Sequence, residues 1–99
     1  MRIIEQLPEQ YQTNITRAVE ILKQGGCTEV FLFGSLASGN FNQQSDIDLA
    51  VRGCPSGNFF HLLGQLMMAL DYPIDLVSLD KDCAFVRYLE REKELYRIA

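Results

Sequence analysis

Three short segments with strand-like hydrophobicity alternate with longer segments of helical period, and this alternation constrains the fold more than any other feature of the sequence. The expected strands are residues 29–33 (EVFLF), 46–52 (DIDLAVR) and 74–79 (IDLVSL). The first is almost continuously apolar, as buried strands are, and the second alternates acidic and apolar residues with period two. Because helical segments separate these strands, we predict a small α/β or α+β sandwich in which a mixed β-sheet packs against helices.

One helix is expected before the first strand and another after the second strand. In residues 8–24 the apolar positions are spaced by 4, 4 and 3 residues, with a proline at the start and Gly25-Gly26 as a left-handed end. Residues 59–70 carry an apolar stripe that follows a capping residue, Asn58. Between the first two strands, residues 34–45 are rich in glycine, serine and asparagine, and we expect a loop with one helical turn.

The C-terminal quarter predicts a last helix and a short final element. Asp80 can cap this helix, whose inner face would consist of Phe85, Val86 and Leu89. Residues 95–98 are either its last turn or a short edge strand, and the strand is favoured.

Length and charge limit the classes of protein that fit. The 99 residues suit one domain covering residues 1–99, and the net charge of −4 disfavours direct binding to nucleic acid. No apolar run reaches the roughly 18–20 residues that a membrane span needs. Glu5 and Pro8 interrupt the region where a signal peptide would be apolar, so we expect a soluble cytoplasmic protein.

The three cysteines, Cys27, Cys54 and Cys83, are an odd number and lack the close spacing of a zinc site. A disulfide framework would use an even number. We therefore expect free thiols in a reducing compartment.

The residues that can carry chemistry lie at two strand ends. Gly34-Ser35 closes the first strand, and Asp46-Ile47-Asp48 opens the second. Alternation places the two aspartates on one face, about 6.5–7 Å apart, with Ile47 turned to the core. Asp75 repeats this arrangement in the third strand. If these strands are neighbours, three carboxylates converge on one face.

Three converging carboxylates repel one another and need a cation or a proton. Oxygen ligands suit Mg²⁺, particularly where substrate phosphates complete its shell. Two such ions can activate a hydroxyl and neutralise a departing pyrophosphate. Gly34 would let a triphosphate approach the backbone, and Ser35 can donate hydrogen bonds to it. The arrangement indicates phosphoryl or nucleotidyl transfer from a nucleoside triphosphate.

The run from Gly34 to Val51, GSLASG-x5-SDIDLAV, resembles the signature of the DNA polymerase β-like nucleotidyltransferases. Asp75, in PIDLV, matches the third carboxylate of that family, and the short chain is similar to its minimal nucleotidyltransferase branch. The resemblance implies the polymerase-β-like nucleotidyltransferase fold and two Mg²⁺ ions. Catalytic and metal-binding roles then fall to Asp46, Asp48 and Asp75, and nucleotide contacts to Gly34, Ser35 and Ser45.

The same resemblance implies a partner. Minimal nucleotidyltransferases pair with small helical HEPN proteins that act as toxins, and the family picture is antitoxin action by transfer of AMP from ATP to a partner tyrosine. We therefore expect the protein to work in a homo- or hetero-oligomeric complex. Exposed apolar surface around residues 59–70, Met68 included, is the expected docking face.

One departure from the family pattern leaves a second function open. The family usually has a basic residue before the second glycine of the signature, whereas this chain has Ser38 before Gly39. The alternative is a non-catalytic nucleotide-binding antitoxin that neutralises its partner by contact. Ser38 favours that alternative, and the complete set of three aspartates favours the enzyme.

Overall fold

A four-stranded sheet in the order β3-β2-β1-β4 organises the chain in the computed structural model, which describes residues 3–42, 44–55, 57–81, 83–92 and 95–99. The elements in chain order are a 3₁₀ helix η1 (Ile3–Gln6), α1 (Glu9–Gln24), β1 (Glu29–Phe33), α2 (Gly34–Ser38), β2 (Ile47–Arg52), α3 (Phe59–Ala69), β3 (Ile74–Ser78), α4 (Ala84–Arg91) and β4 (Tyr96–Arg97). The predicted strands and helices are confirmed, including the single helical turn after β1 and the short C-terminal strand.

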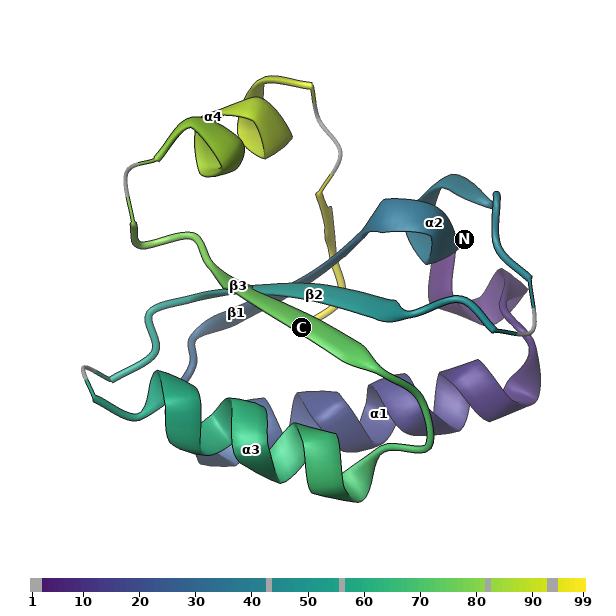
Figure 1. The fold of residues 1–99 in the computed structure, drawn as a ribbon, viewed down its shortest axis with the longest axis horizontal. Helices are drawn as coiled ribbons and strands as arrows, with labels where there is room; N and C mark the ends of the chain where they lie inside the picture. The colour runs from purple at the N-terminus through teal and green to yellow at the C-terminus, as the bar shows by residue number, and fades with distance from the viewer. Residues whose placement is uncertain (1–2, 43, 56, 82, 93–94) are drawn as a thin grey trace.

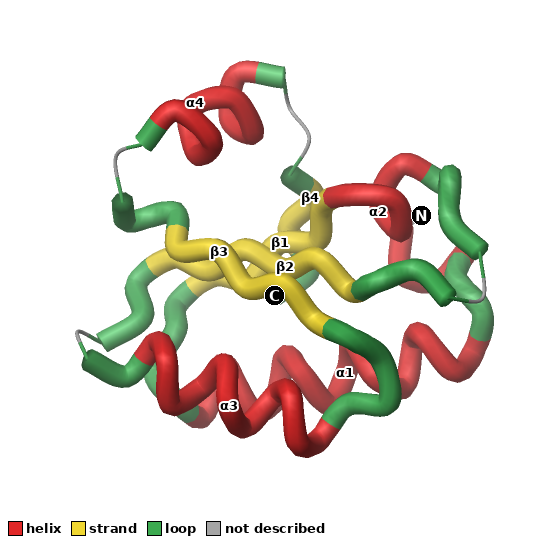
Figure 2. Tube along the Cα trace, viewed as in Figure 1, coloured by secondary structure: helices red, strands yellow, loops and turns green. Residues whose placement is uncertain are grey.

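The sheet is mixed, as expected. β1 runs antiparallel to both β2 and β4, whereas β2 and β3 are parallel and joined through α3. Helices α1 and α3 lie along one face of the sheet, and α4 lies on the other (Figure 1, Figure 2). The short α2 follows the end of β1, and its Leu36 and Ala37 belong to the core cluster of α1 and α3. A parallel pair needs such a crossover, because its strands start at the same edge of the sheet.

The main core lies between the sheet and the helix pair α1 and α3. Its side chains from β2 are Ile47, Leu49 and Val51, none of which is accessible to solvent. A smaller cluster lies on the opposite face under α4 and consists of Phe33, Ala50, Leu79, Val86 and Leu89. β2 is therefore covered on both faces along part of its length, and the alternation inferred from DIDLAVR is confirmed.

The end of β3 differs from expectation. Asp80 does not cap α4, because its Oδ2 accepts a hydrogen bond from the backbone N–H of Gly53 at 2.9 Å. The residue at the N-cap position is Cys83. On α4, Val86 and Leu89 are buried as predicted, whereas Phe85 contacts the ring of Phe33 but remains 48% exposed.

More of the surface of helix α3 is exposed to solvent than the apolar stripe of residues 59–70 predicted. Leu62, Leu66 and Leu70 are buried, whereas Met67 and Met68 are 65% and 91% exposed. Asn58 occupies the N-cap position, but its side chain accepts no capping bond from the helix, and its amide Nδ2 donates to the carbonyl oxygen of Gly25 at 2.9 Å. This bond ties the start of α3 to the end of α1.

The expectation of three free thiols is wrong for Cys27 and Cys54, which form a disulfide with a Cα–Cα distance of 4.0 Å. Cys83 is free and exposed. The antiparallel register pairs Glu29 with Arg52, and continuing it by two residues sets Cys27 opposite Cys54. An odd count and wide spacing say nothing about cross-strand register, which is why the sequence argument failed.

None of the helices formed by the described residues combines the length and hydropathy needed to span a lipid bilayer.

The disulfide gives a first prediction. In oxidised protein treated with an alkylating reagent without reductant, Cys83 alone should be modified in a peptide mass map. Reduction should lower the free energy of unfolding by about 3 kcal/mol, because the unfolded chain loses a cross-link closing a loop of this size. The corresponding fall in Tm is about 10–20 °C. Alkylation of all three cysteines without reductant would contradict the pairing.

Candidate active site

Asp48 and Asp75 face each other across the parallel strands β2 and β3. They are direct register partners, and their neighbours Ile47 and Ile74 are paired in the same way on the opposite face. Parallel strands lie about 4.8 Å apart, so two short side chains on paired positions are brought together. The condition set in the sequence argument, that these two strands are neighbours, is met, and the carboxylates of this pair lie on one face.

The electrostatics of the pair are unfavourable without a cation. The pKa of Asp48 is raised to about 6, first by burial, then by the negative charges of Asp75 and Asp46, and last by a hydrogen bond with the Asp75 carboxyl. Asp48 is half-buried, whereas Asp46 and Asp75 are exposed. Desolvation and like charge both disfavour the ionised form, so the site favours a proton or a cation at Asp48.

Gly34 touches the site directly. Its φ is +75°, and a Cβ at this position would overlap Oδ2 of Asp48. Sequence reasoning assigned this glycine to the approach of a triphosphate, but in the structure the missing side chain makes room for a carboxylate. Both the left-handed backbone and the contact require glycine at this position.

The turn that follows Gly34 holds Ser35 close to the end of β1. Ser35 is half-buried, and its carbonyl oxygen accepts hydrogen bonds from the N–H of Gly39 at 3.1 Å and from the hydroxyl of Ser38 at 3.2 Å. The hydroxyl of Ser38, which replaces the usual basic residue, thus forms its hydrogen bond inside the turn.

Ser45 lies in the loop that leads into β2. Its Oγ accepts a hydrogen bond from the backbone N–H of Asn42 at 2.9 Å, and its carbonyl oxygen accepts one from the Tyr11 hydroxyl at 2.9 Å. The Ser45 hydroxyl retains its own proton for donation to a ligand.

Two buried polar residues of α1 position the site, and sequence reasoning did not single them out. The Tyr11 hydroxyl lies within hydrogen-bond distance of the carbonyl oxygens of Ser45 and Asn42, just before β2. Asn14 is 1% exposed and forms two bonds with Asp71, just before β3: its amide donates to the carboxylate, and its Oδ1 accepts from the backbone N–H at 2.7 Å. The available signal was an asparagine on the apolar face of an amphipathic helix.

The donor set suits a hard divalent cation. Within the part of the chain that the structure describes, no three acidic, histidine or cysteine side chains are close enough together to hold a metal ion by themselves. Mg²⁺ is commonly bound through one or two carboxylates, with waters and substrate phosphates completing its shell. An oxygen-only pair, Asp48 and Asp75, with Asp46 in the loop just before β2, therefore fits such an ion when a nucleotide is present.

Four hollows of about 340 to 890 Å³ lie among the described residues, and none of these four is lined by Asp46, Asp48 or Asp75. A ligand at the carboxylates would lie across the sheet, between α2 and α4.

The raised pKa predicts how stability depends on pH. Asp48 binds its proton more tightly in the folded than in the unfolded state, so it lowers stability as pH rises from about 4 through about 6. Asp48→Asn removes this penalty. In chelator-treated protein, the Tm of the variant relative to wild type should increase from pH 4 to pH 7 and level off above that. A Tm difference that does not change with pH would contradict the assignment.

The glycine contact can be tested against a matched control. Gly34→Ala should lower stability by more than Gly39→Ala, because both have positive φ but a Cβ at Gly39 meets nothing within 4 Å. The left-handed backbone alone costs about 1–2 kcal/mol. Equal losses in thermal denaturation would show that Asp48 moves away from Gly34 without cost.

The fold has clear counterparts among solved structures. A protein provisionally assigned as a minimal nucleotidyltransferase is 22% identical, with a TM-score of 0.66 over 100% of this chain and 96% of the other. A toxin–antitoxin complex with AMP-PNP gives 24% identity and a TM-score of 0.65, covering 91% of this chain and 72% of the other.

A third structure is the tri-AMPylated HEPN toxin of Shewanella oneidensis in complex with an MNT antitoxin, with 24% identity, a TM-score of 0.61 and coverage of 87% and 69%. The chain has no match among curated protein sequences. Its residues 10–97 match the profile described as polymerase beta, nucleotidyltransferase. With this match over most of its length, and with the predicted fold confirmed, the chain belongs to the polymerase β nucleotidyltransferase family.

Proposed function

We propose that this protein is a Mg²⁺-dependent nucleotidyltransferase that transfers AMP from ATP to a tyrosine hydroxyl of a HEPN-type partner and thereby acts as a cytoplasmic antitoxin. The observation that carries the proposal is the pairing of Asp48 with Asp75 across β2 and β3, beside the turn at Gly34. Members of this superfamily generally use divalent metal ions.

In this proposal the three aspartates have separate tasks. Asp46 and Asp48 hold two Mg²⁺ ions, and Asp75 completes one of the two sites. Held there, Mg²⁺ would supply positive charge to balance the triphosphate and the departing pyrophosphate. Asp75 also helps to remove the proton of the acceptor hydroxyl. The hydroxyl oxygen then bonds to the α-phosphorus of ATP as the bond to pyrophosphate breaks.

Nucleotide contacts come from the residues that flank the carboxylates. Ser35 offers its hydroxyl and backbone amide at the start of α2, directly after the glycine that packs on Asp48. Ser45 offers its hydroxyl one residue before Asp46. Both groups can donate hydrogen bonds to phosphate oxygens, and donors to anionic oxygens form stronger bonds than neutral pairs.

The similar solved structures support the choice of partner and nucleotide. One contains AMP-PNP, and another contains an AMPylated HEPN toxin bound to its antitoxin. A nucleotide linked to tyrosine through a phosphodiester adds negative charge and bulk. Such a group would obstruct an RNase site that must receive a phosphate.

Neutralisation by contact alone is the second candidate. The observation that favours it is Ser38, whose hydroxyl is bonded within its own turn where the family usually offers a cation to the triphosphate. In that case the nucleotide site would bind ATP without transferring AMP.

The two candidates differ in the mass of the partner. We would co-express this chain with a HEPN protein encoded beside it, purify the pair, add ATP and Mg²⁺, and measure the partner by intact mass spectrometry. The expected result is an increase of one or more AMP units, absent with Asp46→Asn plus Asp48→Asn. Glu9→Gln plus Glu20→Gln, two exposed acids on α1, removes the same charge as a control and should leave transfer intact.

A tight complex with an unmodified partner would overturn the enzymatic proposal if the aspartate variant also neutralised the partner fully. That combination would establish neutralisation by contact.

A further inference from the structure

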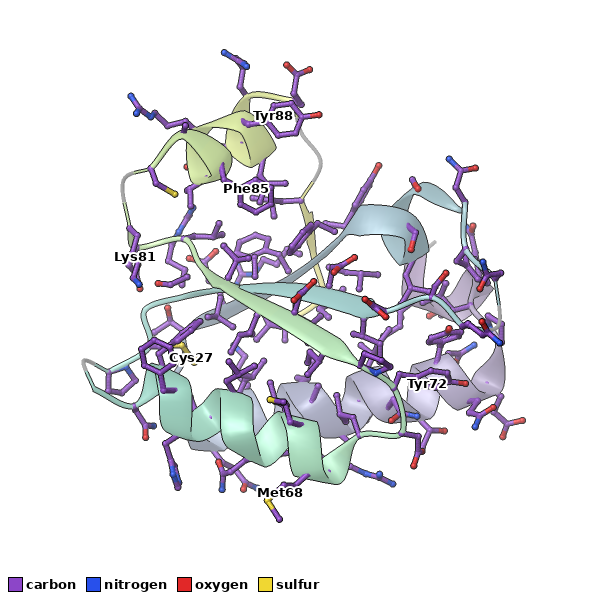
Figure 3. The ribbon with its side chains drawn as sticks, in the orientation of Figure 1. Cys27, Met68, Tyr72, Lys81, Phe85 and Tyr88 are labelled. Atoms are coloured by element: carbon purple, nitrogen blue, oxygen red, sulfur yellow. A yellow bond between two sulfur atoms is a disulfide. The ribbon has the colours of Figure 1, made fainter. Side chains whose placement is uncertain are left out.

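Phe85 is an exposed aromatic residue beside the carboxylates. It lies on α4, and 48% of its surface is accessible, whereas the next apolar residues of the helix, Val86 and Leu89, are buried. Figure 3 shows Phe85 projecting from α4 toward the sheet. A large apolar side chain that leaves a helix and remains half-exposed is an unused contact surface.

The position of the Phe85 ring is set by Phe33. The two ring centroids are 6.1 Å apart with an interplanar angle of 67°, an edge-to-face arrangement. Phe33 is only 8% exposed, and its buried ring supports the ring of Phe85. Such a contact leaves a face of one ring available for stacking.

Phe33 also places this ring next to the acids. It is the direct partner of Asp48 in the antiparallel register of β1 and β2, and directly opposed residues share a face. Val77 belongs to the same cluster under α4 and lies two residues from Asp75, on the same face of β3. Phe33 thus links Phe85 to the acids, because it contacts the Phe85 ring, lies opposite Asp48 and directly precedes Gly34.

We propose that Phe85 forms the nucleobase subsite of the site described above: the base stacks on its ring, and the triphosphate extends across the acids toward Ser35. This inference rests on the proposed function and adds a specificity-determining residue to it. Stacking on an aromatic face accepts every base, and its strength follows the stacking surface of the base. The subsite therefore selects purine over pyrimidine nucleotides and distinguishes ATP from GTP only weakly.

Other aromatic clusters in the described chain are less suitable. Tyr11 and Tyr72 line a hollow of about 640 Å³, but their rings stack on each other at 4.3 Å, and Tyr11 is only 2% exposed. Phe60 is 74% exposed on α3, on the face of the sheet opposite the acids.

The test is calorimetric titration with ATP and, separately, with inorganic tripolyphosphate, both in Mg²⁺. Phe85→Ala should weaken ATP binding about tenfold and leave tripolyphosphate binding unchanged. Phe85→Leu retains an apolar contact with Phe33 but has no aromatic face, so it should show the same loss. Phe85→Trp should restore ATP affinity, and Phe60→Ala should behave like wild type.

A second readout uses the bases themselves. Wild-type protein should bind ATP and GTP within a few-fold of each other and more tightly than CTP and UTP, and Phe85→Leu should reduce this difference. A thermal melt of each variant shows whether α4 remains folded.

Undiminished ATP affinity in Phe85→Leu would overturn the subsite while leaving the proposed function intact. Equal weakening of ATP and tripolyphosphate would also overturn it, because the residue would then act on the phosphates. Failure of wild-type protein to bind either ligand in Mg²⁺ would instead overturn the proposed function and the subsite together.

Discussion

The position of β2 between β1 and β3 is the constraint on which the rest of the structure depends. Ile47, Leu49 and Val51 are completely buried on one face, so the register of the strand is fixed by the core. A shift by one residue would exchange the faces and bury the aspartates. With the register fixed, Asp48 faces Asp75 on one side and lies beside Phe33 on the other. Packing on one face thus determines the chemistry on the opposite face.

Helix α1 fixes the positions of the loops that precede β2 and β3. Tyr11 and Asn14 are buried polar residues whose hydrogen bonds hold Ser45 and Asp71. A buried polar group without a partner is destabilising, so these bonds matter more for stability than exposed ones would. They also set where each acid-bearing strand begins. Stability and site geometry are therefore linked through the same side chains.

One end of the paired strands β1 and β2 carries a stabilising cross-link, whereas the other end carries a destabilising carboxylate. At one end the Cys27–Cys54 disulfide restricts the unfolded chain, and in a reducing compartment this contribution would be lost. At the other end Asp48 packs on Gly34, and its burial, followed by repulsion from Asp75 and Asp46, raises its pKa. A cation that relieves this repulsion would stabilise the fold by binding only the native state. Ligand binding and stability should thus rise together.

The sequence by itself determined the local features. Periodicity located the helices and strands, alternation placed Asp48 on the face opposite Ile47, and the Gly34–Ser35 turn followed from composition. Tertiary structure alone decided which strands are neighbours, that Asp48 pairs with Asp75, that Cys27 meets Cys54, and that Phe85 packs on Phe33, the register partner of Asp48. It also showed that Gly34 contacts the Asp48 carboxylate, which the sequence did not predict. The physical reason is that periodicity reports how each segment meets the core, whereas pairing and register depend on contacts between segments far apart in the chain.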